Sequence, residues 1–293
     1  MLNLAEYRDS LKLDDEWPAP APSKRTDREL FEIAFGGLDG DLAKMTDREL
    51  FTELNHRLIQ RDPEEVNEDV SRAIDVLLYR LSGYLGRTEA RHLARISDMM
   101  PESEYPARDK TVIWRGDARE LVVDAVVNGA RPNLLGYRDY NKPSIDQAIH
   151  GQAGPWLRND CATLYSMSNR ELEPGEAALT RGYRLPARYV LHTLPPTVEG
   201  EVTDADRAAL ASCYTRCLDL ASEKGDITSV SFCSLATGHS HFPFAEATRI
   251  ALDTVAQWLH QNPRSNVNLV VFDIFADEDA EHFVRTIERW VEE

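Results

Sequence analysis

The loop between residues 236 and 243 has the composition of an anion-binding turn. It reads Ala-Thr-Gly-His-Ser-His-Phe-Pro, follows an apolar run that ends at Leu235 and precedes a helix predicted to begin at Phe244. Small residues and a glycine at such a junction present successive backbone amides, and the positive end of the helix dipole adds to them. This arrangement suits a phosphate or a diphosphate. The same sequence is also compatible with an ordinary strand-to-helix connection.

Two histidines alternate along this loop, His239 and His241, so their side chains should point in opposite directions. Two histidines this close can bind a metal ion, but no neighbouring cysteine or carboxylate completes a ligand set. We expect one of them to line a pocket and the other to lie on the surface. The loop contains neither GxxxxGK[ST] nor GxGxxG, which argues against a Walker-type or a classical dinucleotide site.

Polar residues also follow two other predicted strands. Asp117 comes directly after the strand at 111–114, where a carboxylate can accept hydrogen bonds from an adenine amino group or a ribose hydroxyl. An aspartate in this position can equally cap a helix. Asn128 ends the apolar run 125–127, and it can contact a ligand or start a turn.

From Lys110 onward, strands alternate with helices. The apolar patterns predict strands at 111–114, 124–130, 187–194, 229–235 and 266–275, and helices at 145–157, 204–224, 244–261 and 277–293. Strands separated by long helices indicate an α/β fold with a mostly parallel or mixed sheet covered on both faces. Ligands of such folds bind beyond the carboxyl ends of the strands. The three polar loops should therefore lie at one edge of the sheet.

The first third of the chain has a different residue pattern, which is mainly helical. Residues 1–25, with WPAPAP at 17–22, are expected to form an extended lead-in, and residues 26–109 a helical subdomain before an α/β domain at 110–293. The hexapeptide TDRELF occurs at 26–31 and at 46–51, each copy with the spacing of a capping box. An internal repeat is one explanation, and we favour two independent helix starts. Further helices are predicted at 66–85 and 89–99.

Composition limits the class of partner and compartment. The 293 residues carry 33 basic and 50 acidic side chains, and the net charge of −17 opposes nucleic acid and anionic lipid. No apolar run reaches the roughly 18 residues of a membrane span, and the amino terminus has no secretory pattern. Four cysteines in a chain this long do not form a disulfide framework, and none has metal-ligand spacing. We expect a cytoplasmic protein without nucleic-acid or membrane partners. The oligomeric state is left open.

Taken together, these loops resemble the macrodomain family, which binds ADP-ribose. The likeness is to the bacterial zinc-containing macrodomains that hydrolyse protein ADP-ribosylation and carry a helical amino-terminal extension. It rests, in chain order, on residues 116–130, 134–136, 145–158, 189–196, 213–221, 231–243 and 270–279. The resemblance implies a macrodomain-like three-layer α/β/α fold with a mixed central sheet.

The resemblance also implies roles for individual residues. Asp117, beside Ala118, would receive the adenine amino group, and Phe275 would pack near the adenine. Asn128 would lie beside the ligand, and the amides of Thr237, Gly238 and His239 would hold the diphosphate. The remaining expected contacts are Ala118, Arg131, Tyr137, Ala236, Ser240 and His241.

The departures from the family pattern fall at the reacting end of the site. The zinc-containing relatives place cysteine, histidine and cysteine where this chain has Tyr137, Lys142 and Ser144, which are poor zinc ligands. The relatives' second asparagine, which orients the distal ribose, corresponds to Arg131. The expected cofactor is therefore none, and the family zinc is predicted to be absent. The rebuilt segment is either functional or a solvated loop released from its earlier task.

Three functions are compatible with this pattern. The first is a module that binds free or protein-linked ADP-ribose without cleaving it. The second is a zinc-independent ADP-ribosyl hydrolase, with Asp139 or Asn133 as the group that activates water. The third is a scaffold for another nucleotide, because Arg131 and Lys142 add positive charge near the distal ribose. The sequence favours the first, whose partner would be ADP-ribose or an ADP-ribosylated protein.

Overall fold

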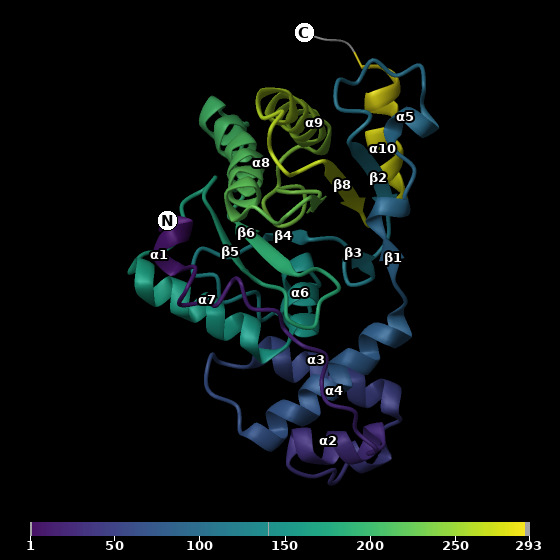
Figure 1. The fold of residues 1–293 in the computed structure, drawn as a ribbon, viewed down its shortest axis with the longest axis vertical. Helices are drawn as coiled ribbons and strands as arrows, with labels where there is room; N and C mark the ends of the chain where they lie inside the picture. Colours follow the sequence, from purple (N-terminus) through teal and green to yellow (C-terminus); the bar gives the residue numbers. More distant parts are fainter. Residues whose placement is uncertain (1, 140, 291–293) are drawn as a thin grey trace.

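A computed structural model describes residues 2–139 and 141–290, and it has a six-stranded mixed sheet at its centre (Figure 1). The strand order is β2-β8-β7-β4-β6-β5, and every neighbouring pair is parallel except β5 with β6. The strands are β2 (Thr111–Arg115), β4 (Ala125–Gly129), β5 (Ala177–Arg181), β6 (Tyr189–Thr193), β7 (Ser229–Cys233) and β8 (Leu269–Ile274).

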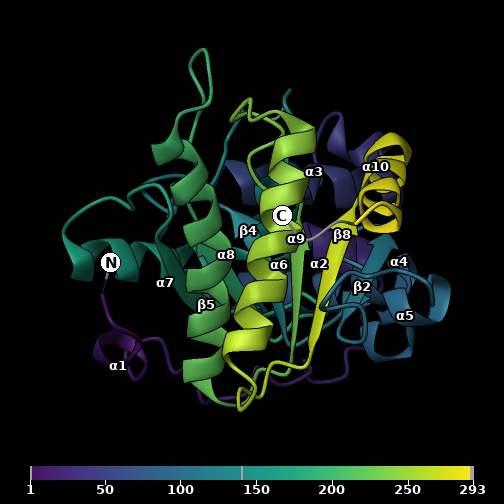
Figure 2. The same cartoon turned by 90° about the horizontal axis from the view of Figure 1, so that it is seen from above.

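Helices cover both faces of this sheet, which confirms the predicted three-layer α/β/α architecture. In the view from above, α8 (Asp204–Lys224) and α9 (Phe244–Gln261) lie side by side over the strands (Figure 2). Tyr214 of α8 packs on Phe232 of β7, and Phe272 of β8 packs on Phe283 of α10 (Asp277–Glu288). The opposite face carries α6 (Ile145–Ala153) and α7 (Pro155–Ser168).

Two elements of this domain differ from the sequence prediction. The helix expected at 145–157 is broken at Gly154, whose φ of +89° is left-handed, and Pro155 starts α7. Strand β5 has the sequence Ala-Ala-Leu-Thr-Arg, which carries little strand propensity. It forms because it pairs antiparallel with β6 at the sheet edge.

The helical subdomain contains α2 (Asp27–Phe35), α3 (Asp47–Gln60) and α4 (Glu68–Leu85), with a short 3₁₀ turn at Leu42–Lys44. Both TDRELF copies form capping boxes, because Thr26 and Thr46 each accept a bond from the amide three residues on. The two predicted helix starts are confirmed. The three helices share an apolar cluster of their own, separate from the core around the sheet.

The segment between the subdomain and β2 belongs to the main core. Thr88–Glu89 form β1, which pairs parallel with β3 (Leu121–Val122), and a 3₁₀ turn (Ala90–His92) and α5 (Ile96–Met99) follow. The helix predicted at 89–99 is therefore wrong, because pairing with β3 overrides the local helical pattern. Buried Tyr105, beyond α5, joins the core around the sheet.

The amino-terminal residues require a similar correction. Residues 17–24 are extended as expected, but Leu4–Tyr7 form helix α1. Four apolar side chains anchor this start in the main core, namely Leu4, Tyr7, Leu11 and Leu13. The Tyr7 hydroxyl accepts a hydrogen bond from the Leu179 amide of β5 at 3.1 Å. Within the described residues, no helix combines the length and apolar character needed to cross a membrane.

Candidate functional site

A cavity of about 430 Å³ opens at the carboxyl ends of β4, β6 and β7. Its walls come from the loop after β4, the loop after β6 and the loop between β7 and α9. The residues that line it are Gly129–Pro132, Tyr137, Pro143–Ile145, Leu194, Pro195, Thr197, Cys233–Ala236 and Gly238–Ser240. None of these described lining residues is acidic, although the chain carries a net charge of −17. The cavity is thus suited to an anion within a protein that otherwise repels anions.

The loop between β7 and α9 supplies hydrogen-bond donors to this cavity. Ala236 has a left-handed φ of +67°, and the Phe242 amide donates to the Ala236 carbonyl at 3.0 Å, which closes the turn. Within the part of the chain that is described, the successive amides from Ala236 to Ser240 donate to no backbone carbonyl, and those of Thr237, Gly238 and His239 are among them. Free amides just ahead of a helix form an anion-binding concavity.

Three side chains stack across the reacting end of the cavity. The Arg131 guanidinium lies over the Tyr137 ring, 4.5 Å from its centroid. Tyr137 in turn stacks on His239, with ring centroids 5.2 Å apart and an interplanar angle of 29°. The stack joins the loop after β4 to the amide-rich loop after β7, so both loops enclose the same volume.

Asp117 and Phe275 lie in the loops that follow the neighbouring strands β2 and β8. Burial raises the pKa of Asp117, but hydrogen bonds from Arg119 outweigh this and hold it below its usual range. The Arg119 Nη2 atom donates to Asp117 Oδ2 at 2.5 Å, and Ala118 between them is buried. Phe275 is 82% exposed, an unusual state for a large apolar side chain, and its ring is available for an aromatic base.

A second carboxyl, which the sequence analysis did not identify, lies beneath this end of the site. Asp273 of β8 pairs in register with Trp114 of β2 and Cys233 of β7, and it is only 6% exposed. Its Oδ1 atom has no hydrogen-bond partner among the described residues. Burial, with a further contribution from the charge of Asp117, raises the pKa of Asp273 to about 8.

Replacing this buried acid gives a pH-dependent prediction. Between about pH 4 and pH 8 the folded protein keeps a proton on Asp273 that the unfolded chain releases, so this group makes stability fall as pH rises. The slope is at most about 1.4 kcal/mol per pH unit. Asp273→Asn should therefore gain melting temperature over the wild type progressively from pH 5 to pH 8. If the melting temperatures of the variant and the wild type change in parallel with pH over that interval, Asp273 titrates as an ordinary carboxyl.

Asn128 lies in a buried polar network rather than on the cavity wall. Its Nδ2 atom donates to Asp146 Oδ1 at 2.8 Å and lies 3.2 Å from His192 Nδ1. The second oxygen of Asp146, on α6, accepts a bond from the Tyr137 amide at 2.5 Å. The pKa of Asp146 is raised by burial in spite of these bonds. The network links the end of β4 to the backbone of the loop that carries Tyr137.

His150, Cys161 and His192 are brought together behind this network, and within the described residues they are the one cluster with metal-ligand chemistry. They come from α6, α7 and β6, with Cys161 Sγ 3.8 Å from His192 Nε2. The same Nε2 lies 2.9 Å from the Thr180 hydroxyl, so both ring nitrogens of His192 have polar neighbours. Burial, aided by the charge of Arg158, lowers the pKa of His150 to about 3. The positive charge of Arg158 so close to the cluster opposes the binding of a metal cation. We therefore interpret the three residues as part of the polar core.

The other predicted site residues are distributed as follows. His239 and Ser240 line the cavity and His241 does not, although both histidines are exposed. Neither Asn133 nor Asp139 lines it. The Asn133 side chain accepts a bond from the Leu135 amide, and Asp139 is exposed and accepts one from the Asn141 amide.

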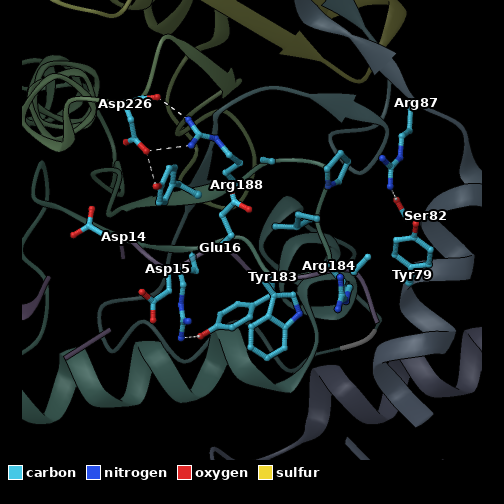
Figure 3. A pocket seen from close by; sticks show the side chains of 17 residues that line it. Asp14, Asp15, Glu16, Tyr79, Ser82, Arg87, Tyr183, Arg184, Arg188 and Asp226 are labelled. Carbon is cyan, nitrogen blue, oxygen red and sulfur yellow. Dashed lines mark hydrogen bonds and ion pairs between the residues drawn. The ribbon is translucent and has the colours of Figure 1, made fainter. Parts of the chain in front are cut away.

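A second cavity, of about 360 Å³, lies near the amino end of β6 and has a different character (Figure 3). Three of its four arginines pair with carboxylates, for example Arg188 with Asp226 at 3.1 Å, whereas Arg87 is hydrogen-bonded to the Ser82 hydroxyl. Arg184 forms a salt bridge with Asp75 at 2.6 Å. Because these paired cations are already neutralised, this cavity is less suited to an anionic ligand than the one above β4.

Comparison with known proteins adds the family context. The chain matches the Macro domain family over residues 127–251. It is 34% identical over 220 residues to a protein-ADP-ribose hydrolase of Treponema medium, a match that covers 75% of this chain and 80% of the relative. The corresponding protein of Staphylococcus aureus (strain MSSA476) is 35% identical over 200 residues, covering 68% and 73%.

Solved structures agree with these matches. An Oceanobacillus iheyensis macrodomain with ADP is 33% identical, with a TM-score of 0.54, and the match covers 60% of this chain and 88% of that one. A Trypanosoma brucei macrodomain in complex with ADP-ribose is 26% identical, with a TM-score of 0.58 and coverage of 91% and 97%.

Proposed function

This chain belongs to the macrodomain family, and from that premise we propose that it binds ADP-ribose, free or attached to a protein. The observation that carries the proposal is the run of loop amides that donate to no backbone carbonyl, Thr237, Gly238 and His239 among them, beside a cavity that Gly238 and His239 line and whose described lining residues include no acidic side chain. A diphosphate needs such donors, because the net charge of the protein repels it. The Trypanosoma brucei relative, whose structure contains ADP-ribose, supports this choice of ligand.

In the proposed complex the ligand spans the carboxyl edge of the sheet. The adenine lies between Asp117 and Phe275, and the diphosphate lies on the loop amides. The distal ribose then reaches the stack of Arg131 on Tyr137. The adenine amino group must share Asp117 with Arg119, which donates to both carboxylate oxygens.

Removal of the adenine acceptor is the direct test of this arrangement. A hydrogen bond to a charged group contributes about 1.5–3 kcal/mol, so Asp117→Ala should weaken ADP-ribose binding by about 10- to 100-fold. Isothermal titration calorimetry measures the change. Asp109→Ala, in an exposed residue just before β2, is the matched control and should bind like the wild type.

The same titration decides the proposal itself. Absence of heat from wild-type protein at high micromolar concentration would rule out an ADP-ribose-binding function. A thermal-shift series with other nucleotides covers the remaining alternative, since stabilisation by one of those and none by ADP-ribose would indicate a scaffold adapted to a different ligand.

The residues present do not fit the zinc of the zinc-containing relatives. Ser144 accepts a bond from the Gln147 amide and caps α6, and Tyr137 is stacked on His239. Lys142 offers an ammonium group, which is not a zinc ligand at neutral pH. We therefore propose that the loop after β4 works without a metal ion, and we derive no step through one.

A second candidate function is hydrolysis of protein-linked ADP-ribose. It is favoured by the relatives named protein-ADP-ribose hydrolase, which are about a third identical to this chain over the aligned residues. The candidate water-activating residues remain Asp139 and Asn133. Their side chains are engaged with the loop backbone, so a role in catalysis requires this loop to exchange those bonds when substrate binds.

Release of ADP-ribose from modified proteins distinguishes the two candidates. A hydrolase should release it from serine-, aspartate/glutamate- or arginine-linked substrates, and Asp139→Ala or Asn133→Ala should reduce the rate. Binding without release from any of the three linkages would leave the binding function and exclude the hydrolase.

The proposal extends to compartment and partners. All four cysteines are free thiols, which supports a reducing cytoplasm. The net charge of −17 supports the absence of nucleic acid among the partners.

A further inference from the structure

The helical subdomain contacts the loop that closes the reacting end of the cavity. The carboxyl end of α3 and the two residues after it lie against residue 138 of that loop. Gln60 Nε2 donates to the Arg138 carbonyl, and the Arg138 guanidinium pairs with Asp62, with Nη1 and Oδ1 2.7 Å apart. Both backbone and side chain of Arg138 are thus held by the subdomain.

The α/β domain holds the same loop from its other side. Asp146 accepts the Tyr137 amide at 2.5 Å, and the Gln147 side chain donates to the Asp139 carbonyl at 2.7 Å. Three successive loop residues are therefore hydrogen-bonded to helices: Tyr137 to α6, Arg138 to α3 and Asp139 to α6. Tyr137, which stacks on His239 at the cavity, is the first of the three.

The end of α3 is itself fixed in place, so it can serve as a support. Arg158 of α7 is 3% exposed, and its Nη1 atom donates to the carbonyls of Leu58 and Arg61. Asn55 packs directly on Gly151 of α6, where an added Cβ would lie 1.9 Å from its Oδ1 atom. These contacts join α3 to the α/β domain and leave little freedom in the position of Gln60 and Asp62.

We propose that Gln60 and Asp62 are positioning residues, through which the helical subdomain sets the place of the loop that encloses the distal ribose. This inference rests on the proposed ADP-ribose-binding function. Arg138 transmits the constraint to Tyr137, its neighbour in the chain. The subdomain thereby contributes to binding although its side chains do not line the cavity.

The test compares two ligands on the full chain. The double variant Gln60→Ala/Asp62→Ala should weaken ADP-ribose binding by about three- to tenfold, since an exposed ion pair and one hydrogen bond each contribute little. Binding of ADP, which lacks the distal ribose, should stay within about twofold of the wild type. Glu64→Ala, which removes the neighbouring Arg61–Glu64 pair, is the control and should change neither affinity.

Two further measurements separate positioning from general damage. Hydrogen exchange of the amides of residues 137–139 should accelerate in the double variant and not in the control. The charge-swapped pair Asp62→Arg with Arg138→Asp should recover part of the ADP-ribose affinity that either single change removes.

Each outcome decides the inference. Equal loss of ADP and ADP-ribose affinity, or wild-type exchange and affinity in the double variant, would overturn it. A wild-type protein that binds neither ligand would refute the proposed function, whereas the exchange rate of the loop would still report whether α3 holds it.

Discussion

Replacement of Gly238 by glutamate should abolish measurable ADP-ribose binding while the protein still folds. A Cβ atom at this glycine meets no atom within 4 Å, and its φ is not left-handed, so a side chain fits without strain. Because Gly238 lines the cavity, the added carboxylate brings a negative charge close to the place proposed for the diphosphate. We expect a loss of at least about 100-fold, or about 2.7 kcal/mol, by calorimetry.

Gly83→Glu provides the matched control for this change. Gly83 lies within helix α4, its added Cβ also meets no atom within 4 Å, and its φ is ordinary. The control has the same net charge as Gly238→Glu, so any general effect of added acidity on ligand approach is equal in the two. Near-wild-type affinity in Gly238→Glu, with both variants folded, would contradict the assignment of the diphosphate to this loop.

The second large effect concerns stability. Asp146→Ala removes the acceptor of both the Asn128 amide and the Tyr137 backbone amide from a fully buried site. Loss of one partner leaves the buried donors unpaired, and such changes cost about 3 kcal/mol or more. Urea unfolding should show this loss as a lower midpoint with an unchanged slope.

The exposed Asp109 again gives the comparison, because Asp109→Ala should stay within about 0.5 kcal/mol of the wild type. A midpoint for Asp146→Ala as high as that of Asp109→Ala would mean that water replaces the lost acceptor. In that case the hydrogen bonds that join β4 to the loop at Tyr137 would contribute nothing to the free energy of unfolding.

Local sequence patterns predicted much of this fold because they report local physics. The two TDRELF helix starts depend on contacts three residues apart, and the strands β2, β7 and β8 are short apolar runs. The predictions failed where pairing decided the outcome. Thr88–Glu89 form a strand because they pair with β3, and β5 forms because it pairs with β6.

The residues of the candidate site also fall into those that local sequence predicted and those that depend on tertiary contacts. The loop at 236–243 was visible in the sequence because the backbone geometry proposed to bind an anion is set by consecutive residues. Asp273 was not visible, since a carboxyl within an apolar strand gains its raised pKa only from the neighbours that bury it. Asn128 was expected beside the ligand, and the structure places its side chain in the network behind the cavity.

By itself the sequence determined the class of fold, five of the six strands of the central sheet and the composition of the loop that we propose to hold a diphosphate. These features follow from propensity, periodicity and turn chemistry within a few residues. Only the tertiary structure decided that a cavity free of acidic residues exists in so acidic a chain, and that α3 holds the loop at Arg138. Both depend on residues about 80 to 100 positions apart in the sequence, whose proximity arises from packing of the whole core.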